Sequence, residues 1–145
     1  MEPKRSFVEA PPKKECISFL TDLAQFNPRD ALIGWLIYAT NLSVEEVLKL
    51  KLETRCDALE AIQEEKYVEP IEELMEEYIE GRCIKEPKEY LFVTLTGGRL
   101  SKSSLDGCFK YAGDRLNCPI TPGALQRAHN RDFKSFDIAE HLKRK

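Results

Sequence analysis

Residues 90–105 read YLFVTLTGGRLSKSSL, and this stretch decides how the chain is expected to fold. The apolar run Tyr90–Thr94 is typical of a short strand, and the TGGR sequence at 96–99 is a turn signal that ends it. A serine just after the turn can cap a following helix. Further on, Ile120-Thr121-Pro122 opens a last helix, because threonine is a good cap and proline is favoured in a first turn.

The residues upstream of this stretch predict further helices. Apolar spacing predicts a helix from Lys13 or Lys14 to Ala24, and the NPRD sequence at 27–30 breaks the chain and restarts it. Residues 31–40 are apolar nearly all round, which is typical of a helix buried in the middle of a domain. Ser43 with Glu46 forms a capping box, and helical spacing returns over 70–81.

Residues 57–71 carry two apolar runs around the polar sequence QEEK at 63–66, as a β-hairpin would. Alanine and glutamate are poor strand residues, which weakens that interpretation. The fold class that we expect is therefore mainly α with a small β-hairpin or sheet (α+β).

Composition indicates one domain. With 145 residues the chain is long enough for one core. Consecutive prolines end a flexible N-terminal arm at residues 1–12, and a single domain is expected over 13–145. No apolar run approaches the length of a membrane span, and no signal-type stretch is present, so we expect a cytoplasmic protein. The five cysteines and two histidines show no ligand spacing, so neither a metal nor a cofactor is expected.

Charge is unevenly distributed around the net value of −3. Residues 45–90 hold seven Lys/Arg against fifteen Asp/Glu, and residues 91–145 hold ten against five. The basic last third is therefore a candidate phosphate-facing surface, with ordinary surface variation as the alternative.

Several segments, taken in order, resemble the catalytic domain of the tyrosine recombinase (phage integrase) family. They are the 90–105 stretch, FKYAG at 109–113, ITP at 120–122, RDALI at 29–33 and TNLSVEEVLKL at 40–50. The last of these is similar to the family's Thr-Gly-Leu-Arg-x-x-Glu-Leu-x-x-Leu box. The resemblance implies a fold that cuts DNA by attack of a tyrosine hydroxyl, with two arginines, a lysine and histidine or tryptophan partners around the phosphate.

The positions that match the catalytic groups are substituted. The first arginine falls on Ser43, and the His-x-Leu-Arg motif after ITP falls on Gly123, Leu125 and Gln126. Arg127 is the next residue, but one helical step is a rotation of about 100°, so we expect it to point elsewhere. Lys66 is the candidate remnant of the family lysine, with a solvated lysine as the alternative. The nucleophile is expected on helices beyond residue 145, and no tyrosine follows Tyr111, so we expect a degenerate, C-terminally truncated and non-catalytic relative.

Three uses of such a scaffold are open. The first is DNA binding without cleavage by the basic last third, whose candidate phosphate contacts are Arg99, Lys102, Lys110, Arg115, Arg127, Arg131, Lys134 and the tail 143–145. The second is binding to another protein, a recombinase or a regulator, through the acidic residues 64–80. The third is a split recombinase completed by a partner chain. A helix–turn–helix regulator over 29–50 is a further alternative, and the oligomeric state is left open.

Overall fold

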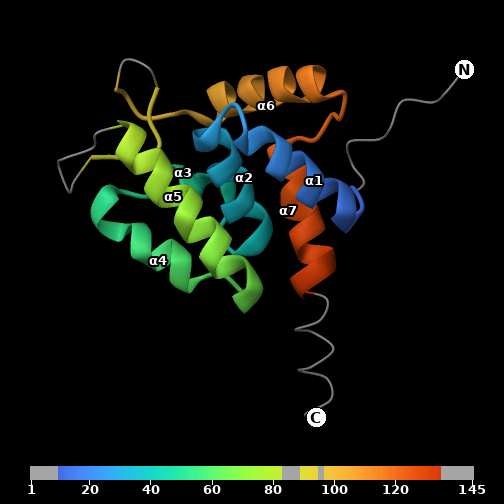
Figure 1. The fold of residues 1–145 in the computed structure, drawn as a ribbon, viewed down its shortest axis with the longest axis horizontal. Helices are drawn as coiled ribbons and strands as arrows, with labels where there is room; N and C mark the ends of the chain where they lie inside the picture. The colour runs from blue at the N-terminus through green and yellow to red at the C-terminus, as the bar shows by residue number, and fades with distance from the viewer. Residues whose placement is uncertain (1–9, 83–88, 95–96, 135–145) are drawn as a thin grey trace, which may run out of the picture.

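The computed structural model describes residues 10–82, 89–94 and 97–134, and that part of the chain is built from seven α-helices (Figure 1). The helices are α1 (Lys13–Ala24), α2 (Pro28–Ala39), α3 (Val44–Leu48), α4 (Arg55–Glu60), α5 (Val68–Arg82), α6 (Lys102–Leu116) and α7 (Pro122–His129). Short 3-10 turns at Leu52–Thr54 and Glu65–Tyr67 precede α4 and α5, and a π-helical turn, Asn130–Lys134, follows α7.

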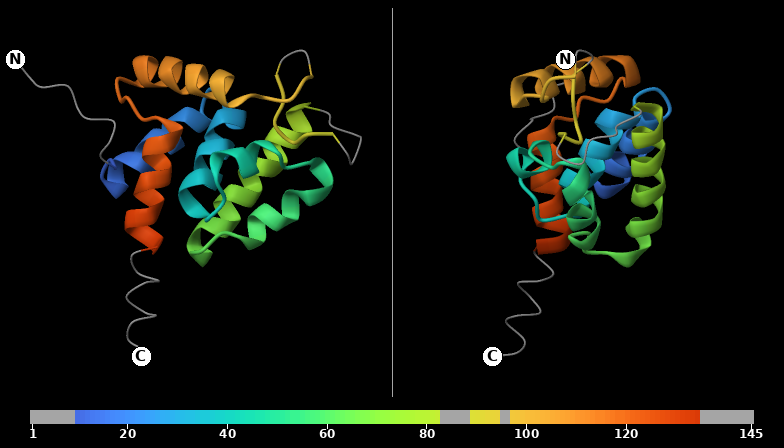
Figure 2. Two further views of the ribbon diagram at one scale, coloured as in Figure 1. Left: turned by 180° about the vertical axis from the view of Figure 1, so that it is seen from behind. Right: turned by 90° about the vertical axis from the view of Figure 1, so that its left-hand side faces the viewer.

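Helix α2 is the centre of the fold, because every residue from Asp30 to Ala39 is buried. It packs against α1, α7 and α5, and also contacts α3 and α6. The two views in Figure 2 place α7 and α4 on opposite sides of α2, with α6 lying across one end. The expectation of a buried, all-round apolar helix over 31–40 is confirmed.

The predicted helix starts are confirmed by their capping contacts. The Asn27 side chain accepts a hydrogen bond from the backbone N–H of Asp30 at the start of α2. Ser43 and Glu46 form the complete capping box of α3. Thr121 Oγ1 accepts from the backbone N–H of Ala124 at 3.0 Å, and Pro122 begins α7.

The predicted β-hairpin over 57–71 is wrong, and with it the α+β fold class. That stretch forms α4, the 3-10 turn Glu65–Tyr67 and the beginning of α5. Within the described ranges the backbone forms isolated β-bridges, Thr40 with Ile62 among them, and no strand. The helical preference of alanine, leucine and glutamate prevails over the hairpin-like spacing, because these residues lose little side-chain freedom in a helix.

The short strand predicted at Tyr90–Thr94 is also wrong, because this run forms only isolated bridges, Tyr90 with Lys51 and Val93 with Arg99. The backbone N–H of Leu91 donates to the Leu50 carbonyl at 2.8 Å, and Val93 forms a bridge with Arg99. The turn that follows is confirmed: Thr94 N–H donates to the Gly98 carbonyl, and Gly97 has a φ of +91°, a conformation that favours glycine. The Tyr78 hydroxyl donates to the Leu91 carbonyl at 2.8 Å and so ties this segment to α5.

One continuous apolar core joins the helices, and Trp35, Tyr38 and Phe109 are part of it. Tyr38 contacts Trp35, Tyr67 and Phe133 edge to face. Residues 1–9 of the predicted arm and the tail from 135 lie outside the described residues. None of the helices described is both long and apolar enough to cross a membrane.

Candidate functional site

The segments that matched the recombinase catalytic positions meet at one polar pocket of about 230 Å³. It lies where the turn after α2 faces α7, and it is lined by Asn41, Leu42, Gly123, Gln126, Arg127, His129 and Asn130. Two of the predicted positions, Gly123 and Gln126, are therefore brought together. We call this cluster the α2–α7 pocket.

Ser43 comes directly after Asn41 and Leu42, which line the α2–α7 pocket, but its own side chain caps helix α3. Its Oγ accepts from the backbone N–H of Glu46 at 3.1 Å, and its own N–H donates to the Glu46 carboxylate at 2.8 Å. A capping hydroxyl carries no charge, so Ser43 supplies a helix cap beside this pocket and no cation.

Arg127 lines the pocket together with Gln126. Its Nη1 lies 3.5 Å from where a β-carbon on Gly123 would stand, so the side chain runs back along α7 across the glycine. The Arg127 Nε is buried and has no hydrogen-bond partner among the described residues. Because the residue as a whole is only partly buried, its guanidinium is a natural site for an anion such as phosphate.

His129 also lines the pocket but is held by the core. Its Nδ1 lies 2.8 Å from the Tyr38 carbonyl oxygen, which fixes Nδ1 as a donor, and its ring stacks on Phe133. The side chain is 2% exposed. His129 therefore orients the end of α7 rather than offering a solvent-accessible base.

The remaining predicted phosphate contacts are spread over several segments. Arg99 pairs with Glu45 at 3.7 Å, and Arg131 pairs with Asp132 at 2.7 Å. The Arg115 guanidinium lies 4.2 Å from the centre of the Phe26 ring. Lys102 and Lys110 are exposed on α6, whereas the Lys134 side chain lies outside the described residues.

Lys66, the candidate remnant of the family lysine, lies away from the α2–α7 pocket. Its Nζ is 3.8 Å from a Glu64 carboxylate oxygen and 5.3 Å from the centre of the Tyr67 ring. The side chain is largely exposed. These contacts are those of a solvated surface lysine.

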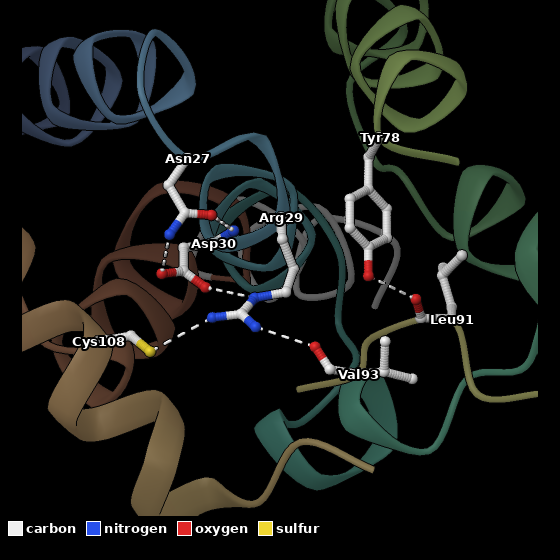
Figure 3. A network of polar contacts seen from close by, with 7 residues as sticks. All are labelled: Asn27, Arg29, Asp30, Tyr78, Leu91, Val93 and Cys108. Carbon is white, nitrogen blue, oxygen red and sulfur yellow. Dashed lines mark hydrogen bonds and ion pairs between the residues drawn. The ribbon is translucent and has the colours of Figure 1, made fainter. Parts of the chain in front are cut away.

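Sequence reasoning missed a second polar cluster at the start of α2, drawn in Figure 3. Arg29 donates from Nε to Asp30 at 2.9 Å, from Nη1 to the Val93 carbonyl at 2.9 Å and from Nη2 to Cys108 Sγ at 3.3 Å. Asn27 donates to the other oxygen of Asp30 at 2.8 Å. Burial raises the pKa of Asp30, and the guanidinium beside it opposes that shift.

The Arg29 cluster is structural by its geometry, since each nitrogen of its guanidinium already has a partner within the protein. The available signal was an Arg-Asp pair in the first turn of an otherwise apolar helix. In the described ranges, no group of three histidine, cysteine or acidic side chains is placed to hold a metal ion.

Neither a protein-family model nor a curated protein sequence matches the chain. Among solved structures, the chain is similar to XerA recombinase, with a TM-score of 0.66 and 20% sequence identity. The match covers 89% of this chain and 50% of the XerA chain, so this chain spans half the length of that recombinase. The protein therefore has a recombinase-like fold.

Proposed function

We propose that this chain is a recombinase-like protein that binds DNA without cleaving it. The observation that supports this most is the chemistry of the α2–α7 pocket. Of the residues that line it, Arg127 alone carries a guanidinium, and Gln126 and Gly123 occupy positions where the recombinase motif has an arginine and a histidine.

Strand cleavage needs more cations than this pocket supplies. Charge stabilisation is usually the largest catalytic contribution, and loss of one such donor costs about 100- to 1000-fold in rate. A nucleophile is also needed, and within the described ranges no tyrosine lines the pocket. The Tyr38 hydroxyl donates to Asp132 at 2.6 Å, and burial and that bond raise the pKa of Tyr38, so its phenol stays protonated.

Binding a phosphate requires fewer charged groups than cleaving a DNA strand, and it requires no nucleophile. Arg127 supplies a positive charge, and Asn41, Gln126 and Asn130, which line the same pocket, have side-chain amides of a kind that can donate to an anion. Contacts of this kind position a backbone phosphate without reading bases. We therefore expect DNA binding that is weak, that depends little on the DNA sequence and that weakens as the salt concentration rises.

Replacement of Arg127 with alanine is expected to weaken duplex DNA binding by about tenfold and to flatten the dependence of log affinity on log salt by about one unit. A gel-shift titration at two salt concentrations measures both quantities. Lys14→Ala, on an exposed site of α1, is the matched control and should leave both within about twofold. Equal affinities for wild type and Arg127→Ala would show that the α2–α7 pocket does not bind DNA. The absence of a retarded band for the wild-type chain at low salt would refute the proposal that the chain binds DNA.

Incubation with a nicked suicide substrate is expected to give no covalent protein–DNA adduct. The double variant Ser43→Arg/Gln126→Arg should bind the same DNA more tightly, because two guanidinium groups are added, and still form no adduct, because no nucleophile is added. Denaturing electrophoresis after nuclease digestion detects such adducts. An adduct with the wild-type chain would refute the non-catalytic assignment.

A further inference from the structure

A groove of about 470 Å³ runs between α4 and α5, on the side of α2 away from α7 (Figures 1 and 2). Its apolar part is made by Leu59 of α4 and by Met75 and Ile79 of α5. Leu59 and Ile79 are only partly buried, so the groove presents apolar surface to solvent. Met75 is 2% exposed and belongs to the core, so the exposed apolar surface comes from Leu59 and Ile79.

The edge of this groove is acidic. Glu72, Glu76 and Glu80 line it at intervals of four residues, which places them in one row along α5. The fifteen residues of α5 contain six glutamates and one basic residue, Arg82 in the last turn. Residues 53–80 as a whole hold eleven acidic and two basic residues, a net charge of −9.

Arg55 is the one basic residue among those that line the groove, and it makes a hydrogen bond within the protein. Arg55 Nη1 donates to the Leu52 carbonyl at 2.7 Å, which ties the side chain to the 3-10 turn before α4. Three glutamates and one arginine line the groove, so its lining carries a net negative charge. Such a surface repels DNA phosphate and attracts a cationic partner.

We propose that the α4–α5 groove binds a basic amphipathic helix of another protein. The apolar strip matches side chains spaced three and four residues apart on one face of a helix, and the glutamate row matches lysines or arginines beside that face. This inference goes beyond DNA binding and does not depend on it, because the groove and the α2–α7 pocket lie on different helices. A groove of this size holds few side chains, so the complex is weak and transient.

The test uses the whole chain and a fluorescein-labelled peptide of alternating Leu and Lys pairs, which places leucines on one helical face. Anisotropy at physiological salt is expected to show saturable binding. The variant Glu72→Lys/Glu76→Lys should weaken it by about tenfold or more, because two attractive carboxylates become repulsive ammonium groups. A peptide of equal composition with strict Leu-Lys alternation, which cannot form an apolar helical face, should bind at least about tenfold more weakly.

The matched control is Glu69→Lys/Glu73→Lys, which makes the same charge change on exposed positions of α5 that do not line the groove. It should retain most of the affinity, and circular dichroism should show that both double variants fold. If both double variants lost the same amount of peptide affinity, the attraction would depend on net charge and not on the groove, and the proposal would be overturned. No binding of the helical peptide, equal binding of the alternating peptide, or a self-association abolished by Glu72→Lys/Glu76→Lys would overturn it as well.

Discussion

Replacing Asp30 with alanine is expected to lower the free energy of unfolding by about 3 kcal/mol, because it removes one partner of a buried ion pair. Asp30 is 1% exposed and accepts hydrogen bonds from Arg29 and Asn27. Without it the guanidinium of Arg29, whose side chain is 18% exposed, remains among the helices with no carboxylate beside it. Burial raises the pKa of Asp30 even in the pair, so the loss comes mainly from the uncompensated arginine.

Urea denaturation followed by circular dichroism measures this loss. Asp106→Ala, the same change at an exposed site of α6, should stay within about 0.5 kcal/mol of wild type. The double variant Arg29→Ala/Asp30→Ala should lose less than the sum of the two single losses, because it leaves no charge unpaired. A loss below about 0.5 kcal/mol for Asp30→Ala would show that Arg29 is satisfied by water and by its other acceptors.

Local contacts were the part of the fold that could be predicted from the sequence. The caps at Asn27, Ser43 and Thr121 each join residues three apart, so the sequence carries the whole interaction. The buried character of α2 was equally accessible, because an apolar helix with no polar face has nowhere to lie except inside a domain.

The predicted hairpin over 57–71 was wrong because apolar spacing over short runs does not distinguish a helix from a strand. The Arg29 cluster was missed for a different reason. Its acceptors on Val93 and Cys108 lie 64 and 79 residues along the chain, and only the packed fold brings them to one guanidinium.

For the candidate site, the resemblance singled out Gly123 and Gln126, and the structure places both in one pocket beside the turn after α2. That Arg127 lines the same pocket could not be predicted, because helical rotation fixes a Cα–Cβ direction and not the path of a long side chain. Nor could charge counting foresee that Arg99 and Arg131 are already paired with Glu45 and Asp132. Because the other basic residues are scattered, Arg127 is the residue whose contribution to DNA binding should be tested first.

Gly34→Ala is expected to lower the free energy of unfolding by about 1–3 kcal/mol, because it inserts a methyl group where four helices meet. A β-carbon on this residue of α2 would overlap Leu20 of α1 and stand 3.2 Å from Phe109 of α6 and 3.3 Å from Leu125 of α7. All three neighbours are buried, so none can turn its side chain out to solvent. Alanine can be accommodated only if these side chains change rotamer or the helices move apart, and either change disturbs close-packed contacts around α2.

Gly107→Ala makes the same chemical change in α6, where a β-carbon would have no atom within 4 Å. There the substitution should raise the free energy of unfolding by about 0.5–1 kcal/mol, because alanine loses less backbone freedom than glycine on entering a helix. Gly34→Ala receives a similar helix-propensity gain, so the difference between the two variants isolates the steric cost at the centre of the fold. Opposite signs in thermal or urea unfolding are therefore the expected result, and a stabilised Gly34→Ala would mean that α2 does not pack this closely against α1, α6 and α7.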